Sequence, residues 1–203
     1  MGKIWKRMGI CLLLAGVVWT WALIRDRAAL SRELIRFHVV ANSDSEIDQN
    51  VKLRVRDAVL DSLYDGMADI GDVEKAKEYL RENLPKIQSA ANKALEAAGV
   101  DSHAVVSLCR ETFDIRKYDT FTLPAGVYES LRIVIGEGQG KNWWCVAFPT
   151  LCLGATTEEF EESAQMAGMS TSLTKTIANE GSCRIRFFLL DALGKVENLC
   201  FQG

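Results

Sequence analysis

Residues 36–46 read Arg-Phe-His-Val-Val-Ala-Asn-Ser-Asp-Ser-Glu, and they change from a mainly apolar run to a polar cluster at Asn42. The short, valine-rich first part is typical of a buried β-strand. The second part consists of residues that commonly start helices. Ser43 and Glu46 have the spacing of a capping box, in which a hydroxyl and a carboxylate satisfy the first N–H groups of a helix. The sequence therefore predicts a strand that leads directly into a helix.

Two stretches with helical periodicity come next. Residues 47–64 and 73–98 carry apolar side chains every three or four positions, which predicts two amphipathic helices. Asp72 is the expected N-cap of the second helix, and Gly99 suits the position just after its end. Pro85 interrupts this second stretch, so either the helix bends there or a new helix begins near it.

The remainder of the chain predicts a sheet followed by helices. Its β-branched and aromatic runs indicate several strands, and the glycine-rich loop 136–140 should join the last two of them as a hairpin. Strands and helices in this order indicate an α+β fold, with a largely antiparallel or mixed sheet covered by helices. The expected strands are 104–109, 131–135 and 143–148, with 118–121 as an extension, and the expected helices are 158–169 and 185–196, with 172–180 irregular or helical.

The N-terminus has the features of a signal sequence or transmembrane anchor. Three basic residues, Lys3, Lys6 and Arg7, precede 17 uncharged residues at 8–24. As a helix this run is roughly 26 Å long, near the minimum for crossing a bilayer. Basic residues before such a run stay inside, so the rest of the chain should lie outside the cytoplasm.

Cleavage of this segment is the less favoured alternative. The best small-residue site, Thr20-Trp21-Ala22, departs from the usual small-x-small pattern. Trp19 and Trp21 instead resemble the aromatic anchors found at a membrane surface. We therefore divide the chain into a signal sequence or anchor at 1–27, a single extracytoplasmic α+β domain at 28–196, and a tag remnant or disordered tail at 197–203. That tail differs by one letter from a protease site that is widely used to remove tags.

The charge of the domain argues against nucleic acid as a partner. The chain has 24 basic and 27 acidic residues, of which residues 1–27 hold 5 and 1, so the remainder has 19 and 26 and a net charge of −7. Binding to nucleic acid depends on basic residues that neutralise phosphates. We expect a protein or small-molecule partner, together with the membrane that the N-terminal helix enters.

Five cysteines lie beyond the N-terminal segment, at 109, 145, 152, 183 and 200. Export permits disulfides, and an odd number leaves at least one cysteine without a partner inside the chain. Cys145 and Cys152 are the first candidate pair. No Cys-x-x-Cys or nearby histidine supplies further ligands, so we expect neither a zinc site nor another metal or cofactor.

Several residues have the chemical character of a site. Gly136, Gly138 and Gly140 precede Lys141, but a strand rather than a helix should follow, so a hairpin loop is favoured over a phosphate-binding loop. Trp143 and Trp144 point to opposite faces of their strand, and the outward ring needs cover from a helix of this chain or from a partner.

No convincing catalytic set is present in the sequence. His38 could act with Cys145 or Cys152 as a nucleophile pair, or could gather a metal with Asp44 and Asp48, but a histidine with its hydrogen bonds satisfied is favoured in each case. Residues 42–48 are already explained as a helix cap. We therefore do not expect an enzyme.

Two groups of motifs resemble stage II sporulation protein R of endospore-forming Firmicutes. The first is HVVANSDS at 38–45, which continues through Asp48-Gln49 to KLRVRDAV at 52–59. The second is PAGVY at 124–128, LRIVIG at 131–136 and NWWCV at 142–146, followed by Phe148-Pro149 and Leu151-Cys152. The resemblance extends over about residues 1–155.

This resemblance implies a signalling protein. Members of the family are made in the forespore and exported into the space between the two septal membranes, where they activate a membrane-embedded aspartic protease of the mother cell that cleaves pro-sigma-E. The family supplies no catalytic or ligand residue. The alternatives are an exported hydrolase that uses Cys145 or Cys152 with His38, and a wall-binding module. The candidate partner-binding residues are Asn42, Asp44, Asp48, Gly136, Gly138, Gly140, Trp143 and Trp144.

Overall fold

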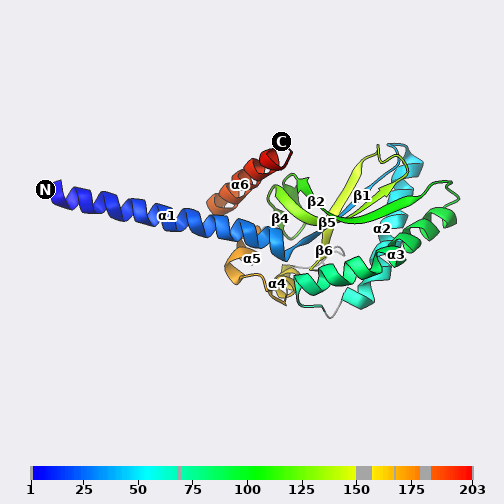
Figure 1. Ribbon diagram of the computed structural model, residues 1–203, viewed down its shortest axis with the longest axis horizontal. Coiled ribbons are helices and arrows are strands. Elements are labelled where there is room, and N and C mark those ends of the chain that lie inside the picture. The colour runs from blue at the N-terminus through cyan, green and yellow to red at the C-terminus, as the bar shows by residue number, and fades with distance from the viewer. Residues whose placement is uncertain (1, 68–69, 150–156, 167, 179–183, 203) are drawn as a thin grey trace.

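The computed structural model describes the chain except for residues 1, 68–69, 150–156, 167, 179–183 and 203. A long helix, α1, projects from a domain that is built around one sheet (Figure 1). The helices are α1 (Gly2–Glu33), α2 (Glu46–Met67), α3 (Val73–Ala97), α4 (Thr157–Met166), α5 (Thr171–Ile177) and α6 (Arg184–Gln202). The strands are β1 (Ile35–Val40), β2 (Ala104–Phe113), β3 (Arg116–Lys117), β4 (Thr122–Leu123), β5 (Gly126–Ile135) and β6 (Asn142–Phe148).

The main sheet is mixed and has the strand order β2-β5-β1-β6. β1 runs parallel to β5 and antiparallel to β6, and β2 is antiparallel to β5. The α+β class and the mixed sheet are therefore confirmed.

The predicted hairpin between β5 and β6 is wrong, because β1 lies between these two strands. Neighbouring strands are about 4.8 Å apart, so the connection has to cross one strand, a gap of nearly 10 Å. The six residues at 136–141 are long enough for this crossing. The local sequence of strand, glycine loop and strand is the same in both arrangements, so periodicity alone does not distinguish them.

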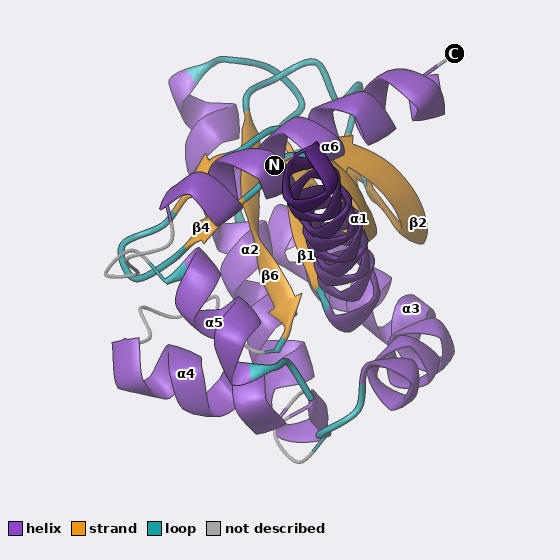
Figure 2. Ribbon diagram, turned by 90° about the vertical axis from the view of Figure 1, so that its left-hand side faces the viewer, coloured by secondary structure: helices purple, strands orange, loops and turns teal. Residues whose placement is uncertain are grey.

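Two hydrophobic clusters lie on the two faces of the sheet. α2 and α3 cover one face, where Phe37 and Ile133 pack against the apolar stripes of both helices. The opposite face is partly covered by the last turns of α1 and by α6, which lie side by side in Figure 2. Leu30 of α1 and Leu190 of α6 are fully buried in this second cluster.

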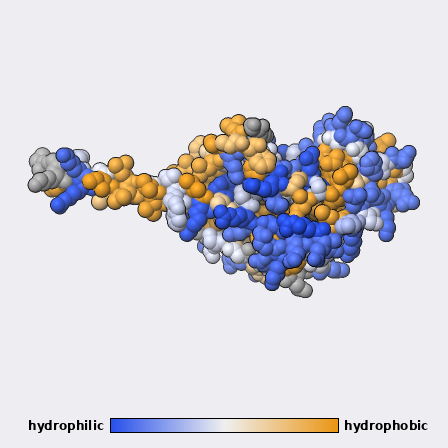
Figure 3. Space-filling view, viewed as in Figure 1, coloured by the Kyte–Doolittle hydropathy of each residue, from blue (hydrophilic) through white to orange (hydrophobic). Residues whose placement is uncertain are grey.

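Helix α1 continues into the domain without a break. It is long and apolar enough to cross a membrane, and its apolar part is almost wholly exposed. From Leu23 onward one side of the helix packs in the domain, with Leu30 fully buried. The helix thus passes straight through residue 27, where we placed the domain boundary. In Figure 3 the apolar run is an exposed helix that projects from the domain.

The structure tests the predicted ends of α3 and the predicted effect of Pro85. Asp72 caps α3 as expected, by accepting from the backbone N–H groups of Glu74 and Lys75. Gly99 follows α3 with a positive φ of 69°. α3 is one helix that contains Pro85, so the alternative of a new helix near Pro85 is wrong.

The capping box was predicted two residues too early. The hydroxyl of Ser45, not that of Ser43, accepts from the backbone N–H of Asp48, and α2 begins at Glu46. Ser43 instead donates to the carboxylate of Asp48. Several residues at 42–46 have side chains that can cap a helix. Where β1 ends decides which of them becomes the cap of α2.

At the other end of the chain, α6 extends beyond the expected helix. The segment that we expected to be a tag remnant or disordered tail is helical as far as Gln202. Asn198 in this segment donates a hydrogen bond to the backbone oxygen of Phe113.

Candidate functional site: a loop pair at the far end of the sheet

Two of the predicted candidate segments meet at one end of the domain. β1 and β5 are parallel, so the loops that follow them leave the sheet at the same edge. β1 starts immediately after α1 and runs away from it, which places both loops at the end remote from the N-terminus of α1 (Figure 1). We call residues 42–48 and 136–141 together the distal tip.

Asn42 joins the two loops of the distal tip. Its side-chain oxygen accepts a hydrogen bond of 3.0 Å from the backbone N–H of Glu137, and its amide nitrogen donates to Asp48 at 2.9 Å. Backbone N–H groups of Gln139 and Gly140 donate to the carbonyls of Asn42 and Ala41. The loop after β5 is therefore fastened to the end of β1 along its length.

The predicted candidates Asp44 and Asp48 contribute differently to this arrangement. Asp44 is exposed and accepts from the backbone N–H of Lys141 at 2.7 Å. Asp48 accepts from Ser43 at 2.6 Å as well as from Asn42. Hydrogen bonds from Ser43 and Asn42 stabilise the charged carboxylate and hold the pKa of Asp48 below its ordinary value. Asp48 is thus a structural anchor of the tip, whereas Asp44 also presents its charge outward.

Lys52 supports the tip from beneath. Its buried ammonium donates to the backbone oxygen of Lys141 at 3.0 Å and to the side chain of Gln49 at 2.7 Å. Burial, which disfavours the charged form, lowers the pKa of Lys52.

Steric reasons that differ between the three positions explain why each of the predicted candidates is a glycine. Gly136 and Gly138 have positive φ angles of 55° and 64°, which side-chain-bearing residues rarely adopt. A Cβ on Gly140 would lie 2.2 Å from the backbone oxygen of Ser43, so the two loops could not approach as they do. Gly136 and Gly140 thus allow the two loops to pack closely, and Gly138 allows the turn between them and β6.

Among the charged outward side chains of the tip three are acidic and one, Lys141, is basic, and the tip also exposes one large apolar residue. Ile47 is 70% exposed, although the helical periodicity assigned it to the core. Asp44, Glu46 and Glu137 are also exposed. The apolar stripe of α2 begins only at Val51, one turn later. An exposed isoleucine among carboxylates suits a protein partner with a basic, partly apolar surface. The sequence pattern could not reveal this, because position 47 falls in the register of the buried stripe.

The two candidate tryptophans lie below the tip and are half-buried by this chain. Trp143 packs edge-on against Phe37 at 5.6 Å on the α2 side, with the guanidinium of Arg56 over its ring. Trp144 is stacked on His38 on the opposite face, and Arg116 lies 3.5 Å from the centre of its ring. The cover on the outward ring thus comes from His38 of β1 and Arg116 of β3, neither of which is on a helix, and it leaves the ring half-buried.

His38 belongs to a hydrogen-bonded network on the partly open face. Its Nδ1 lies 3.0 Å from a carboxylate oxygen of Glu111, and its Nε2 lies 2.9 Å from the side-chain oxygen of Asn142. Burial raises the pKa of Glu111, but the hydrogen bond from His38 and the nearby cations outweigh it and leave the pKa below its ordinary value. Each ring nitrogen thus lies within hydrogen-bond distance of a side-chain oxygen of this chain.

The strand register separates His38 from Cys145. Phe37 pairs with Cys145, and His38 pairs with Trp144. Paired residues share a face and successive residues alternate, so His38 and Cys145 point to opposite sides of the sheet. The nucleophile pair of His38 with Cys145 is therefore wrong. Cys152 lies outside the described residues, and with it the candidate disulfide between Cys145 and Cys152. Within the described ranges no group of three or more His, Cys, Asp or Glu residues could hold a metal ion.

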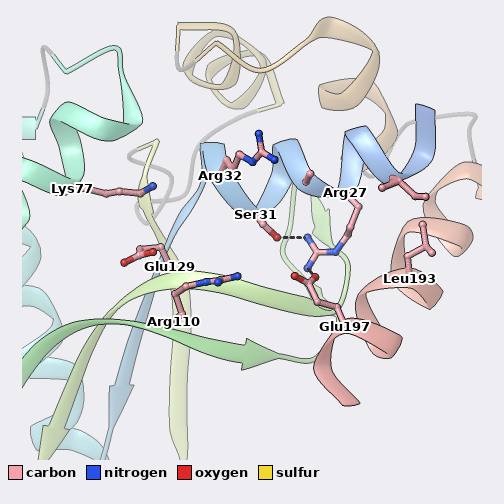
Figure 4. A pocket seen from close by; sticks show the side chains of 10 residues that line it. Arg27, Ser31, Arg32, Lys77, Arg110, Glu129, Leu193 and Glu197 are labelled. Atoms are coloured by element: carbon pink, nitrogen blue, oxygen red, sulfur yellow. Dashed lines mark hydrogen bonds and ion pairs between the residues drawn. The ribbon is translucent and has the colours of Figure 1, made fainter. Parts of the chain in front are cut away.

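A groove of about 510 Å³ lies at the opposite end, where α1 and α6 meet the sheet. Figure 4 shows Arg27 of α1 pointing across it toward Glu197 of α6, with which it forms an ion pair of 2.8 Å. Arg27 also donates to Ser31, which in turn donates to the backbone oxygen of Val127. These contacts make the groove a joint between α1, α6 and the sheet.

The fold and site together define a class: an α+β domain that continues from a membrane-length apolar helix and presents an acidic loop pair at its far end. The family model of stage II sporulation protein R matches residues 31–158, and the chain belongs to this family. The chain is 38% identical over 120 residues to the stage II sporulation protein R of Bacillus subtilis (strain 168). This match covers 59% of the chain and 54% of that protein, so the chain spans about half the length of this curated relative. No solved structure matches the chain significantly.

Proposed function

We propose that this chain is an exported sporulation signalling protein of the forespore, which activates the membrane-embedded aspartic protease of the mother cell that cleaves pro-sigma-E. Membership of the stage II sporulation protein R family supports a role in sporulation. The apolar helix α1 is compatible with export or anchoring. In this proposal the chain is the trigger of proteolysis and contributes no catalytic residue.

The observation that carries the proposal is the position of the distal tip relative to α1. The tip lies at the end of the sheet remote from the N-terminus of α1 (Figure 1). With α1 in the forespore membrane, the tip points across the septal gap toward the mother-cell membrane. A receptor in that membrane would meet Asp44, Ile47 and Glu137 first.

The tip has the properties of a recognition surface. Exposed Ile47 offers apolar area to a partner, and the surrounding carboxylates favour a partner with basic residues on its outer face. Hydrogen bonds between the two loops hold the surface in one shape before binding, which reduces the entropy lost on association.

Processing of pro-sigma-E in cells that depend on this chain as the activator tests the proposal. Ile47→Lys should abolish or strongly reduce processing, because it replaces exposed apolar area by a charge of the wrong sign. Asp44→Asn, which keeps an acceptor for Lys141, should reduce it less. Met166→Lys on α4 is a matched control, since Met166 is 69% exposed and far from the tip. Full processing with both tip variants at normal protein levels contradicts the surface assignment.

A further inference from the structure

Helix α6 has an uncovered apolar face. Ile185, Phe188, Val196 and Leu199 follow one another at helical spacing and are 72%, 68%, 57% and 73% exposed. The spacing places them on one stripe of the helix. Figure 3 shows apolar side chains on the surface of the domain where α6 lies, next to its junction with α1.

The inner face of α6 combines apolar packing with polar contacts, since buried Asp191 accepts from the backbone N–H of Ala125 and Glu197 pairs with Arg27. Leu190 is fully buried against the sheet, and Gly194 approaches the backbone of Ala125 so closely that a Cβ would collide with it. A surface helix normally turns its apolar side inward and its polar side to water, whereas α6 also exposes a row of large apolar side chains. Each large apolar side chain that stays in water forgoes up to about 1.5–3 kcal/mol of burial. Burial of the outer face of α6 against another apolar surface would therefore be favourable.

Two ion pairs fix the position of α6 on α1. Arg186 pairs with Asp26, and Glu197 pairs with Arg27 (Figure 4). Both partners on α1 lie within three residues of Ile24, the last residue of the uncharged run. If α1 enters a bilayer up to this point, the start of α6 lies at the level of the lipid headgroups.

Other residues at this level have the chemistry of a membrane surface. Trp19 and Trp21 are exposed near the end of the apolar run, where aromatic rings favour the interface. The guanidinium of Arg25 lies 5.4 Å from the ring centre of Trp21, and exposed Arg32 follows two turns later. Such cations attract the phosphates of anionic lipids. The apolar face of α6 therefore continues a surface that is already matched to lipid.

We propose that the outer face of α6, formed by Ile185, Phe188, Val196 and Leu199, lies on the same lipid bilayer that α1 enters. Together the two helices provide two contacts with the membrane and limit the tilt of the domain. A cut after Ala22 would leave α6 and every buried residue of α1 in place, so a released domain would still associate with that membrane. The proposal requires α1 at a membrane but does not depend on the identity of the receptor.

Photocrosslinking in proteoliposomes tests this contact with the full-length chain. Phe188→p-benzoylphenylalanine in vesicles of phosphatidylethanolamine and phosphatidylglycerol should give lipid adducts on illumination, detected by mass spectrometry. Trp21→p-benzoylphenylalanine in α1 is the positive control. Ile47→p-benzoylphenylalanine is the matched negative control, since Ile47 is as exposed as Phe188 but lies at the distal tip.

Lipid adducts at positions 21 and 188 together with none at position 47 are the expected result. Adducts at position 21 alone would overturn the proposal, and an adduct that joins two chains at position 188 would assign this face to a second copy instead. Val196→p-benzoylphenylalanine repeats the test on the same face if the variant at position 188 fails to insert. None of these outcomes affects the processing experiment, so the two proposals fail separately.

Discussion

The carboxylate of Asp44 accepts a 2.7 Å hydrogen bond from the backbone N–H of Lys141, 97 residues further along the chain. Through this contact and those of Asn42, the loops that follow β1 and β5 form a single surface. Five properties of the surface and of the sheet beneath it can be measured.

Asn42 should be sensitive even to an isosteric change. Asn42→Asp keeps the acceptor for the N–H of Glu137 but replaces the amide donor that faces Asp48 with a second carboxylate. The lost hydrogen bond and the like charge should lower the free energy of unfolding by about 1–3 kcal/mol. Thermal unfolding followed by circular dichroism measures this change. Asp101→Asn, at another exposed loop position, is the control, and an unchanged Tm for Asn42→Asp contradicts the role of Asn42.

Gly140→Ala should separate the two loops for steric reasons alone. Gly140 does not have a positive φ, but its new Cβ would lie 2.2 Å from the backbone oxygen of Ser43. The backbone has to shift, at a cost of about 1–3 kcal/mol. Gly71→Ala is the matched control, because its nearest neighbour is 3.4 Å away. We expect faster hydrogen exchange at the Lys141 amide in Gly140→Ala and unchanged exchange there in Gly71→Ala.

Asp48 should make stability depend on pH at the acid end. Hydrogen bonds from Ser43 and Asn42 lower the pKa of Asp48 below its ordinary value of 3.8 in the folded protein. Its stabilising contribution is therefore complete above the unfolded pKa and is lost as the pH falls through the folded pKa.

Tm measured between pH 2.5 and 7, a range that starts below the ordinary pKa of 3.8 and ends well above it, checks this expectation. Asp48→Asn should be less stable than the parent at pH 7, and the difference should shrink below about pH 4. If the difference in Tm between the parent and Asp48→Asn is the same at pH 2.5 and pH 7, the charge of Asp48 does not contribute to stability.

Trp144 should contribute to folding rather than to partner contact. Its ring is enclosed by His38 and Arg116, so Trp144→Ala leaves a gap and removes both stacking contacts. For a half-buried ring we expect a loss of about 2 kcal/mol in the free energy of unfolding. Trp144→Phe should recover part of the stability and all of the pro-sigma-E processing. If Trp144→Phe has a normal Tm but no longer supports processing, Trp144 takes part in partner contact instead.

Cys145 should be dispensable for signalling. It faces the core under α2 and α3, on the side of the sheet opposite His38. If the chain is a trigger of proteolysis and not a hydrolase, Cys145→Ala should leave processing at the parental level wherever the variant folds. An inactive Cys145→Ala protein whose near-UV circular dichroism shows an intact fold would support the alternative of a cysteine-dependent hydrolase.

Several features that depend on neighbours in the sequence were predicted correctly, although the capping box was placed two residues too early. The apolar run of α1, the Asp72 cap and the glycine after α3 each follow from residues within a few positions of one another. The candidate segments 42–48 and 136–140 were also identified separately, from their polar and glycine-rich composition. Whether either segment contacts a receptor stays a prediction.

Features that depend on distant partners were missed or placed wrongly. The hairpin of β5 and β6 is a reasonable local prediction, but β1, from a much earlier part of the chain, pairs between them. Ile47 matches the period of the buried stripe and is nevertheless exposed, since it lies in the first turn of α2, ahead of Val51 where the buried residues of this helix begin. The outer apolar face of α6 could not be distinguished from its inner face, because a stripe on a helical wheel does not say which side meets the sheet.

By itself, then, the amino-acid sequence determined that an apolar helix precedes an acidic α+β domain, and which segments carry unusual polar or glycine residues. These properties arise from charge, hydrophobicity and helical period, all of which act over a few residues. Only the tertiary structure decided that β1 inserts beside β5, because strand pairing is settled by the burial of whole faces across the sheet. That choice brings Asp44 to Lys141 and directs the joined loops away from α1.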